Sequence, residues 1–141
     1  MKILLACLLA LLPLIAHAED LGTLSANEVD PNFLPNPFGT GDLSDPNSVT
    51  NELGPYGNPY SPSSATNFEG ITAPRLSDQE GKDRGTLSTN QYNPDSVRNP
   101  YGRYGSPYSP VSIKMPVGAG SLHNPIIPTN PYGHGLRIEG R

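Results

Sequence analysis

Tyrosine is the residue type in this sequence whose placement most suggests a chemical role. Six of the seven tyrosines stand among prolines and glycines, at Tyr56, Tyr60, Tyr101, Tyr104, Tyr108 and Tyr132. A Pro-Tyr-Ser-Pro segment is pre-ordered near polyproline II, so it loses little entropy when it docks in an aromatic-lined groove. We therefore predict a partner-binding surface made of these tyrosines with Pro62 and Pro110, in which repeated copies add avidity.

Two other uses of these tyrosines stay open. Their rings can pack on neighbouring prolines and stabilise local turns. They can also be cross-linked oxidatively within an extracellular matrix.

Catalytic and metal chemistry find little support in the sequence. Cys7 is the only cysteine, and the remaining candidate metal ligands, His123 and His134, are well separated with no cysteine beside them. No Gly-x-Ser-x-Gly nucleophile motif occurs. The Asx-Pro-Asx-Ser segments at Asp45 and Asn93 lack the several carboxylates of a calcium loop. We predict no enzymatic activity, no cofactor and no metal site.

Internal repetition is the clearest organising signal. The segment 45–64 aligns without gaps to the segment 93–112, and more than half of the aligned positions are identical. A second echo, Gly-Thr-Leu-Ser-x-Asn, occurs at residues 22–27 and again at 85–90, with a wider spacing than the first. Asn-Pro-Phe/Tyr-Gly recurs at residues 36–39, 99–102 and 130–133. The identities favour duplication over chance, but the unequal spacing argues against a strict solenoid.

Residues 99–110 and 130–133 carry a resemblance to a known group of proteins. The chain resembles short exported bacterial proteins with tandem Asn-Pro-Tyr-Gly and Ser-Pro-Tyr-Ser-Pro repeats and a Gly-x-Arg/Lys-Ile-x-Gly tail. The resemblance covers about half of the chain that follows the leader, and it implies export from a bacterial cell. It assigns no functional residue.

The N-terminal residues 1–18 have the form of a secretory signal peptide. Lys2 precedes an apolar run that Pro13 interrupts, and Ala16-His17-Ala18 is the small-x-small pattern that precedes cleavage. The run is shorter than the ~20 apolar residues that span a bilayer. We expect cleavage between Ala18 and Glu19, a secreted or periplasmic protein, and no stable membrane span afterwards.

Charge is distributed unevenly along the chain. Residues 19–69 hold eight acidic residues and no Lys or Arg, whereas residues 70–141 hold five acidic and eight basic residues. These two parts could attract each other within one molecule or between molecules, so self-association is one expectation. No basic cluster accompanies the tyrosines, which argues against a nucleic-acid partner.

The composition predicts a chain with little capacity to form a core. After residue 18, Leu, Ile, Val and Phe together fall below the roughly 20% at which a chain can bury a core. Prolines interrupt nearly every segment, and the best alternating runs are residues 111–115 and 136–138. Residues 77–80 have the form of a capping box and allow a short helix. We therefore predict a mostly irregular or disordered fold class that is rich in turns and polyproline II. It would have no stable globular core, and its N-terminal signal peptide would form a helix.

The resulting organisation has six parts. They are the signal peptide 1–18, an acidic Pro/Asn-rich segment 19–44, the first Tyr/Pro repeat 45–64, a polar linker 65–92, the second Tyr/Pro repeat 93–112 and a tail 113–141 with a partial repeat. The predicted function is that of an exported, non-enzymatic protein that presents Tyr/Pro motifs to an unknown protein or envelope partner. The alternative is a self-associating structural or matrix component.

Overall fold

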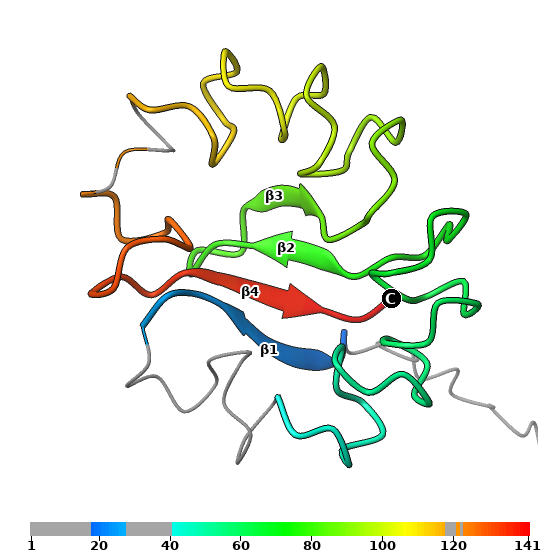
Figure 1. Ribbon diagram of the computed structural model, residues 1–141. Helices are drawn as coiled ribbons and strands as arrows, with labels where there is room; N and C mark the ends of the chain where they lie inside the picture. The colour runs from blue at the N-terminus through cyan, green and yellow to red at the C-terminus, as the bar shows by residue number, and fades with distance from the viewer. Residues whose placement is uncertain (1–17, 28–40, 118–120, 122) are drawn as a thin grey trace, which may run out of the picture.

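A four-stranded antiparallel sheet lies at the centre of the molecule (Figure 1). In the computed structural model the described residues are 18–27, 41–117, 121 and 123–141. The strands are β1 (Asp20–Leu24), β2 (Arg75–Ser77), β3 (Asp83–Thr86) and β4 (Leu136–Glu139), in the sheet order β1-β4-β2-β3. The described residues include no helix, and the predicted signal helix lies outside them, since their first residue is Ala18.

The prediction of a chain without a stable core is wrong. One buried cluster joins the sheet to the segments around it: Leu21, Val49, Tyr56, Leu76, Val97, Tyr104, Leu136 and Ile138, none more than 8% exposed. Its central members come from the strands, where Leu76, Leu136 and Ile138 are fully buried. The few apolar residues therefore gather at one place instead of being spread along an extended chain.

The sheet relates two halves of the chain by an approximate two-fold axis. We call residues 20–77 the first half and residues 83–139 the second half; each begins with an edge strand and ends with a central strand. On the axis Leu76 pairs with Ile138, and the pairs Arg75–Glu139 and Ser77–Arg137 flank it symmetrically. The edge strands are related by the same axis: β1 pairs with β4, and β3 pairs with β2 in the equivalent way. The Gly-Thr-Leu-Ser echo in the sequence thus marks two equivalent edge strands.

Both edge strands contain the same irregularity. Gly22 and Gly85 have φ of 105° and 100°, a region that favours glycine, and the strand register shifts beside each. In each strand the N–H of that glycine donates to the carboxylate two positions earlier, Asp20 or Asp83, at 3.0 Å. The shared Asp-x-Gly-Thr-Leu-Ser sequence therefore builds the same bulged strand twice.

Between the strands the chain forms repeated turn units, which lie around the rim of the sheet in Figure 1. Their sequences follow Asx/Ser-Pro-x-Ser-x-x-Asn-x-x-Gly with some substitutions, at residues 45–54, 61–70, 93–102, 109–118 and 124–133. Backbone N–H groups donate to the carbonyl three positions earlier, so that one turn follows another: Ser48 to Asp45, Asn51 to Ser48 and Gly54 to Asn51. Polar groups of the backbone are thus satisfied locally, without long strands or helices.

The seventh and tenth positions of a unit explain the recurring Asn and Gly. The Asn51 side chain accepts the Leu53 N–H at 2.9 Å and donates to the Asp45 carbonyl at 2.9 Å, closing the unit on its first residue. The equivalent closing bond is made by Asn67, Asn99 and Asn130. A Cβ on Gly54 would lie 2.3 Å from the Pro46 carbonyl oxygen, so only glycine fits the tenth position. The sequence predicts serial turns, and the structure adds that side chains close them and that they pack on a sheet.

Serine, at the fourth position, fills much of the interior next to the sheet. Ser48, Ser64, Ser96 and Ser112 are at most 2% exposed. The Ser96 hydroxyl donates to the Ser88 carbonyl at 2.9 Å and accepts the Arg98 N–H at 3.1 Å, and Ser112 makes the equivalent pair of bonds. A threshold that counts only apolar residues does not detect an interior built partly of serine, because hydrogen-bonded serines can be buried at little cost.

The short helix that the sequence allows does not form, and of the two alternating runs one becomes a strand. The expected helix at residues 77–80 is absent, because Asp78 accepts the N–H groups of Glu80 and Lys82 and closes the β2–β3 hairpin. Residues 111–115 form turns. The alternating run at residues 136–138 lies within β4.

Candidate functional site

The structure divides the predicted tyrosines into a buried pair and an exposed set. Tyr56 and Tyr104 are 8% and 7% exposed and belong to the core. Tyr60, Tyr101, Tyr108 and Tyr132 are 89–95% exposed, and we call them the displayed tyrosines. Pro62 and Pro110 are also exposed. The buried pair therefore stabilises the fold, and only the displayed tyrosines are placed to meet a partner.

Sequence context separates the two kinds of tyrosine. Every displayed tyrosine follows Asn-Pro or Ser-Pro, and its backbone N–H donates to that Asn or Ser side chain at 2.9–3.2 Å. Proline presets the turn, and the tyrosine at the next position points outward. Tyr56 and Tyr104 instead occur in Gly-x-Tyr-Gly, at equivalent places in the two halves.

Tyr56, which follows the first turn unit, is tied to the end of the sheet where β1 begins and β4 ends. Its hydroxyl donates to the Glu19 carboxylate at 3.0 Å, and the Gly140 N–H donates to the Glu19 carbonyl at 2.7 Å. Burial raises the pKa of the Tyr56 phenol, and the bond to Glu19 raises it further. The predicted cleavage residues Ala18 and Glu19 are both exposed and lie directly before β1.

Two cavities open on the turn units of the second half. One, of about 490 Å³, is lined by Thr89, Gln91, Val97, Arg98, Ile113 and Lys114. The other, of about 470 Å³, is lined by Gln91, Tyr92, Asn99, Pro100 and Tyr101. Gln91 lines both, and we call the two cavities together the paired cavities. Their volumes fall within the range of about 300–1,000 Å³ of small-ligand sites.

The paired cavities contain side chains that sequence reasoning missed. Arg98 and Lys114 are exposed, and no described residue forms an ion pair or a hydrogen bond with either charged group. Both stand at the sixth position of consecutive turn units, and this shared position could have indicated that they lie together. Tyr92, 75% exposed, lies across from Phe68 with ring centroids 6.1 Å apart and nearly perpendicular planes.

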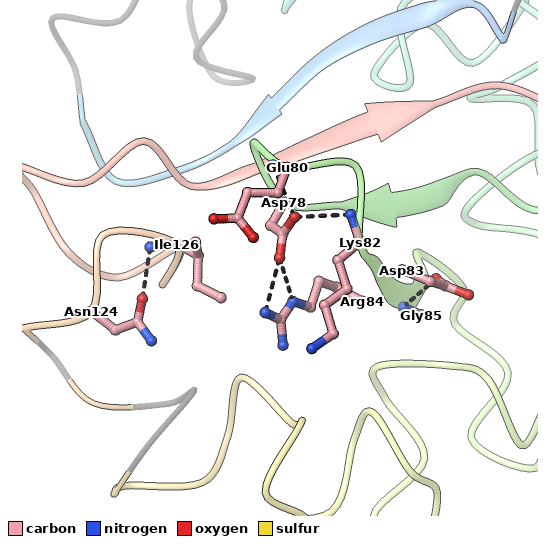
Figure 2. Close-up of polar contacts among 8 residues, drawn as sticks. All are labelled: Asp78, Glu80, Lys82, Asp83, Arg84, Gly85, Asn124 and Ile126. Atoms are coloured by element: carbon pink, nitrogen blue, oxygen red, sulfur yellow. Dashed lines mark hydrogen bonds and ion pairs between the residues drawn. The ribbon is translucent and has the colours of Figure 1, made fainter.

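A third cavity, of about 340 Å³, lies beside the β2–β3 hairpin, near Glu80, Asn124 and His134. Asp78 lines this cavity, and Figure 2 shows it receiving the Lys82 N–H and two bonds from the Arg84 guanidinium, at 2.9 and 3.1 Å. Burial alone would raise the pKa of Asp78, but the Lys82 N–H and the Arg84 charge outweigh it and hold that pKa below its ordinary value. Because these bonds occupy the Asp78 carboxylate and the Arg84 guanidinium, the pair stabilises the hairpin.

The part of the chain that the structure describes contains no group of three or more His, Cys, Asp or Glu residues placed to hold a metal ion. Nor does a helix long and apolar enough to cross a membrane occur among the described residues. Comparison of the chain with protein-family models, with curated proteins and with solved structures finds no match.

Proposed function

We propose that this protein is an exported, non-enzymatic binding protein whose turn units display tyrosines to a partner in the envelope or the extracellular space. The observation that carries the proposal is the repeated presentation of the displayed tyrosines: each is at least 89% exposed and each follows an Asn/Ser-Pro step whose side chain caps its N–H.

The displayed tyrosines have the properties of contact residues. Tyrosine combines a large apolar ring with a polar hydroxyl and loses little side-chain entropy when it is immobilised, which makes it a frequent contact residue. Here the capped turn fixes the backbone of each displayed tyrosine before any partner arrives. A pre-organised scaffold lowers the entropic cost of binding, and several copies add avidity.

Replacing the displayed tyrosines by alanine tests this proposal. Binding of residues 19–141 to the envelope fraction of the producing cells is measured by co-sedimentation. We expect the four-tyrosine variant to lose at least about tenfold in affinity, since several contacts are removed together. A matched control replaces four comparably exposed apolar residues, Leu43, Leu53, Ile71 and Val117, by alanine and should bind as the wild type does. Equal binding by the wild type and the four-tyrosine variant would refute the proposal.

Charge asymmetry supports a second candidate function, self-association of the chain into a structural component. The acidic residues 19–69 of one molecule would contact the basic second half of another. Salt screens such contacts beyond about 10 Å at 0.1 M. Light scattering of the purified protein during a salt titration distinguishes the candidates, because only self-assembly predicts large particles that dissolve as salt is added.

A further inference from the structure

We propose that the paired cavities of the second half form a binding site for an acidic saccharide, with its carboxylate between Arg98 and Lys114 and its sugar ring against Tyr101. This inference rests on the proposed function and specifies the chemistry of one partner that the protein would bind.

The charged side of the site suits a carboxylate. Arg98 and Lys114 line the same cavity without a partner among the described residues, and buried Val97 with half-buried Ile113 forms an apolar wall beside them. A guanidinium can bind a carboxylate through two parallel hydrogen bonds, and an ammonium adds a second positive charge. Two cations at one cavity, neither paired with a described residue, favour an anionic ligand over a neutral one.

The adjoining cavity suits the ring of a sugar. Tyr101 is 95% exposed and Tyr92 is 75% exposed, so both rings can be covered by a ligand. The negative face of an aromatic ring attracts the C–H groups on one face of a pyranose. Gln91 lies between the cavities, and its amide can donate to and accept from sugar hydroxyls.

The first half shows that the turn scaffold does not require these side chains. At the equivalent positions of that half, Thr50, Thr66 and Leu53 replace Arg98, Lys114 and Tyr101. The hydroxyls of Thr50 and Thr66 donate to the carbonyls of Gly41 and Gly57 at 3.2 and 3.0 Å, so these side chains are used within the scaffold. The same fold is therefore built once without cations and once with two of them at one cavity.

The other source of carboxylates is a second copy of this chain, through exposed Glu52 or Glu69. The size of the cavities favours the saccharide. Their volumes of about 490 and 470 Å³ suit a small molecule, whereas a stable protein interface buries about 800 Å² on each partner.

Titration calorimetry with trigalacturonate as the probe, and neutral galactotriose as its uncharged counterpart, tests the site in residues 19–141. We expect trigalacturonate to bind at least about tenfold more tightly than galactotriose. Changing Arg98→Thr and Lys114→Thr together copies the first half and should weaken trigalacturonate binding by at least about tenfold, and Tyr101→Leu by about fivefold. Arg103→Thr removes a charge from the same half outside both cavities and should leave binding unchanged. Thermal unfolding of each variant verifies that the fold is retained.

Three results would overturn the inference. The first is equal binding of the acidic and neutral probes, and the second is wild-type affinity in the Arg98→Thr, Lys114→Thr variant. The third is self-association of the wild type that this variant abolishes, which would assign the cavities to a second copy. Loss of envelope binding in the four-tyrosine variant, together with any of these results, would leave the proposed function standing and remove only the saccharide site.

Discussion

The two halves of the molecule share a scaffold and differ in what they display. Both have a bulged edge strand with a positive-φ glycine, buried serines and a closing asparagine in the turn units, and a central strand on the two-fold axis. Outside the scaffold, the first half displays one tyrosine, Tyr60, together with exposed acidic residues, whereas the second half displays three tyrosines and the cations Arg98 and Lys114. The positions that carry the same residue in both halves are those where the backbone conformation or the packing in the interior restricts the residue type. The positions that differ are exposed, and these are where a function specific to one half can reside.

The largest expected effect is loss of the sheet core at the junction of the halves. Leu76→Ala and Ile138→Ala each remove a fully buried side chain at equivalent places on the two-fold axis. We expect each to lower the free energy of unfolding by about 3 kcal/mol, since both leave a cavity. Leu53→Ala, at a 93% exposed position, should change it by under about 0.5 kcal/mol. Urea denaturation measures all three, and a large difference between the two core variants would contradict the symmetry.

A second prediction compares the closing asparagines of the two halves. Asn51→Ala and Asn99→Ala each remove two side-chain hydrogen bonds and should each cost about 2 kcal/mol. The control Asn47→Ala makes the same change at an exposed third position of a unit and should cost little.

The unit at residues 109–118 sharpens that comparison, because Met115 stands where the other units have asparagine. Met115→Asn can donate to the Ser109 carbonyl in the same way, so we expect a gain of about 1 kcal/mol in urea denaturation. A loss of stability would show that the closing bond does not transfer between units.

A third prediction concerns the hairpin that joins the halves. The pKa of Asp78 is lowered in the folded state, so its contribution is present above the unfolded pKa and is lost as pH falls through the folded pKa. The stability difference between the wild type and Asp78→Asn, expected to be about 2 kcal/mol at pH 7, should therefore shrink on acidification below pH ~4. A difference that stays constant down to pH ~2 would refute this role of the carboxylate.

The smallest predicted effect separates the two buried tyrosines. Tyr56→Phe removes the bond to Glu19 and should cost about 1 kcal/mol, whereas Tyr104→Phe loses no hydrogen bond to a described residue and should be neutral. Because the pKa of Tyr56 is raised in the folded state, the wild type should lose stability as pH rises from about 10 through the folded pKa. Tyr56→Phe should lack this loss, and urea denaturation between pH 8 and 11 checks both statements.

Parts of this fold can be read from the sequence and parts cannot. The two echoes mark equivalent turn units and equivalent edge strands, and the alternation at residues 136–138 marks β4. β1 and β2 are defined by pairing with β4, which lies far along the chain, and no local pattern reveals such pairing. Composition does not predict the core, because serines and turn carbonyls satisfy one another in the interior, so that few apolar residues suffice.

The candidate site was predictable to a similar degree. The Asn/Ser-Pro-Tyr context identifies the displayed tyrosines, whereas the burial of Tyr56 and Tyr104 becomes evident only from distant glycines that pack against them. A Cβ on Gly85 would lie 2.8 Å from the Tyr104 Cβ, and one on Gly140 would lie 2.5 Å from the Tyr56 hydroxyl. Arg98 and Lys114 carry no motif of their own, and only the spacing of the turn units brings them to one cavity.

Heat-induced unfolding of residues 19–141, followed together by calorimetry and by near-ultraviolet circular dichroism of the tyrosines, tests the central claim most directly. A sheet shared by two equivalent halves predicts one cooperative transition, with heat absorption and loss of the tyrosine signal at the same temperature. A gradual change without a heat-absorption peak would show that the turn units do not form a common core, and would contradict this account.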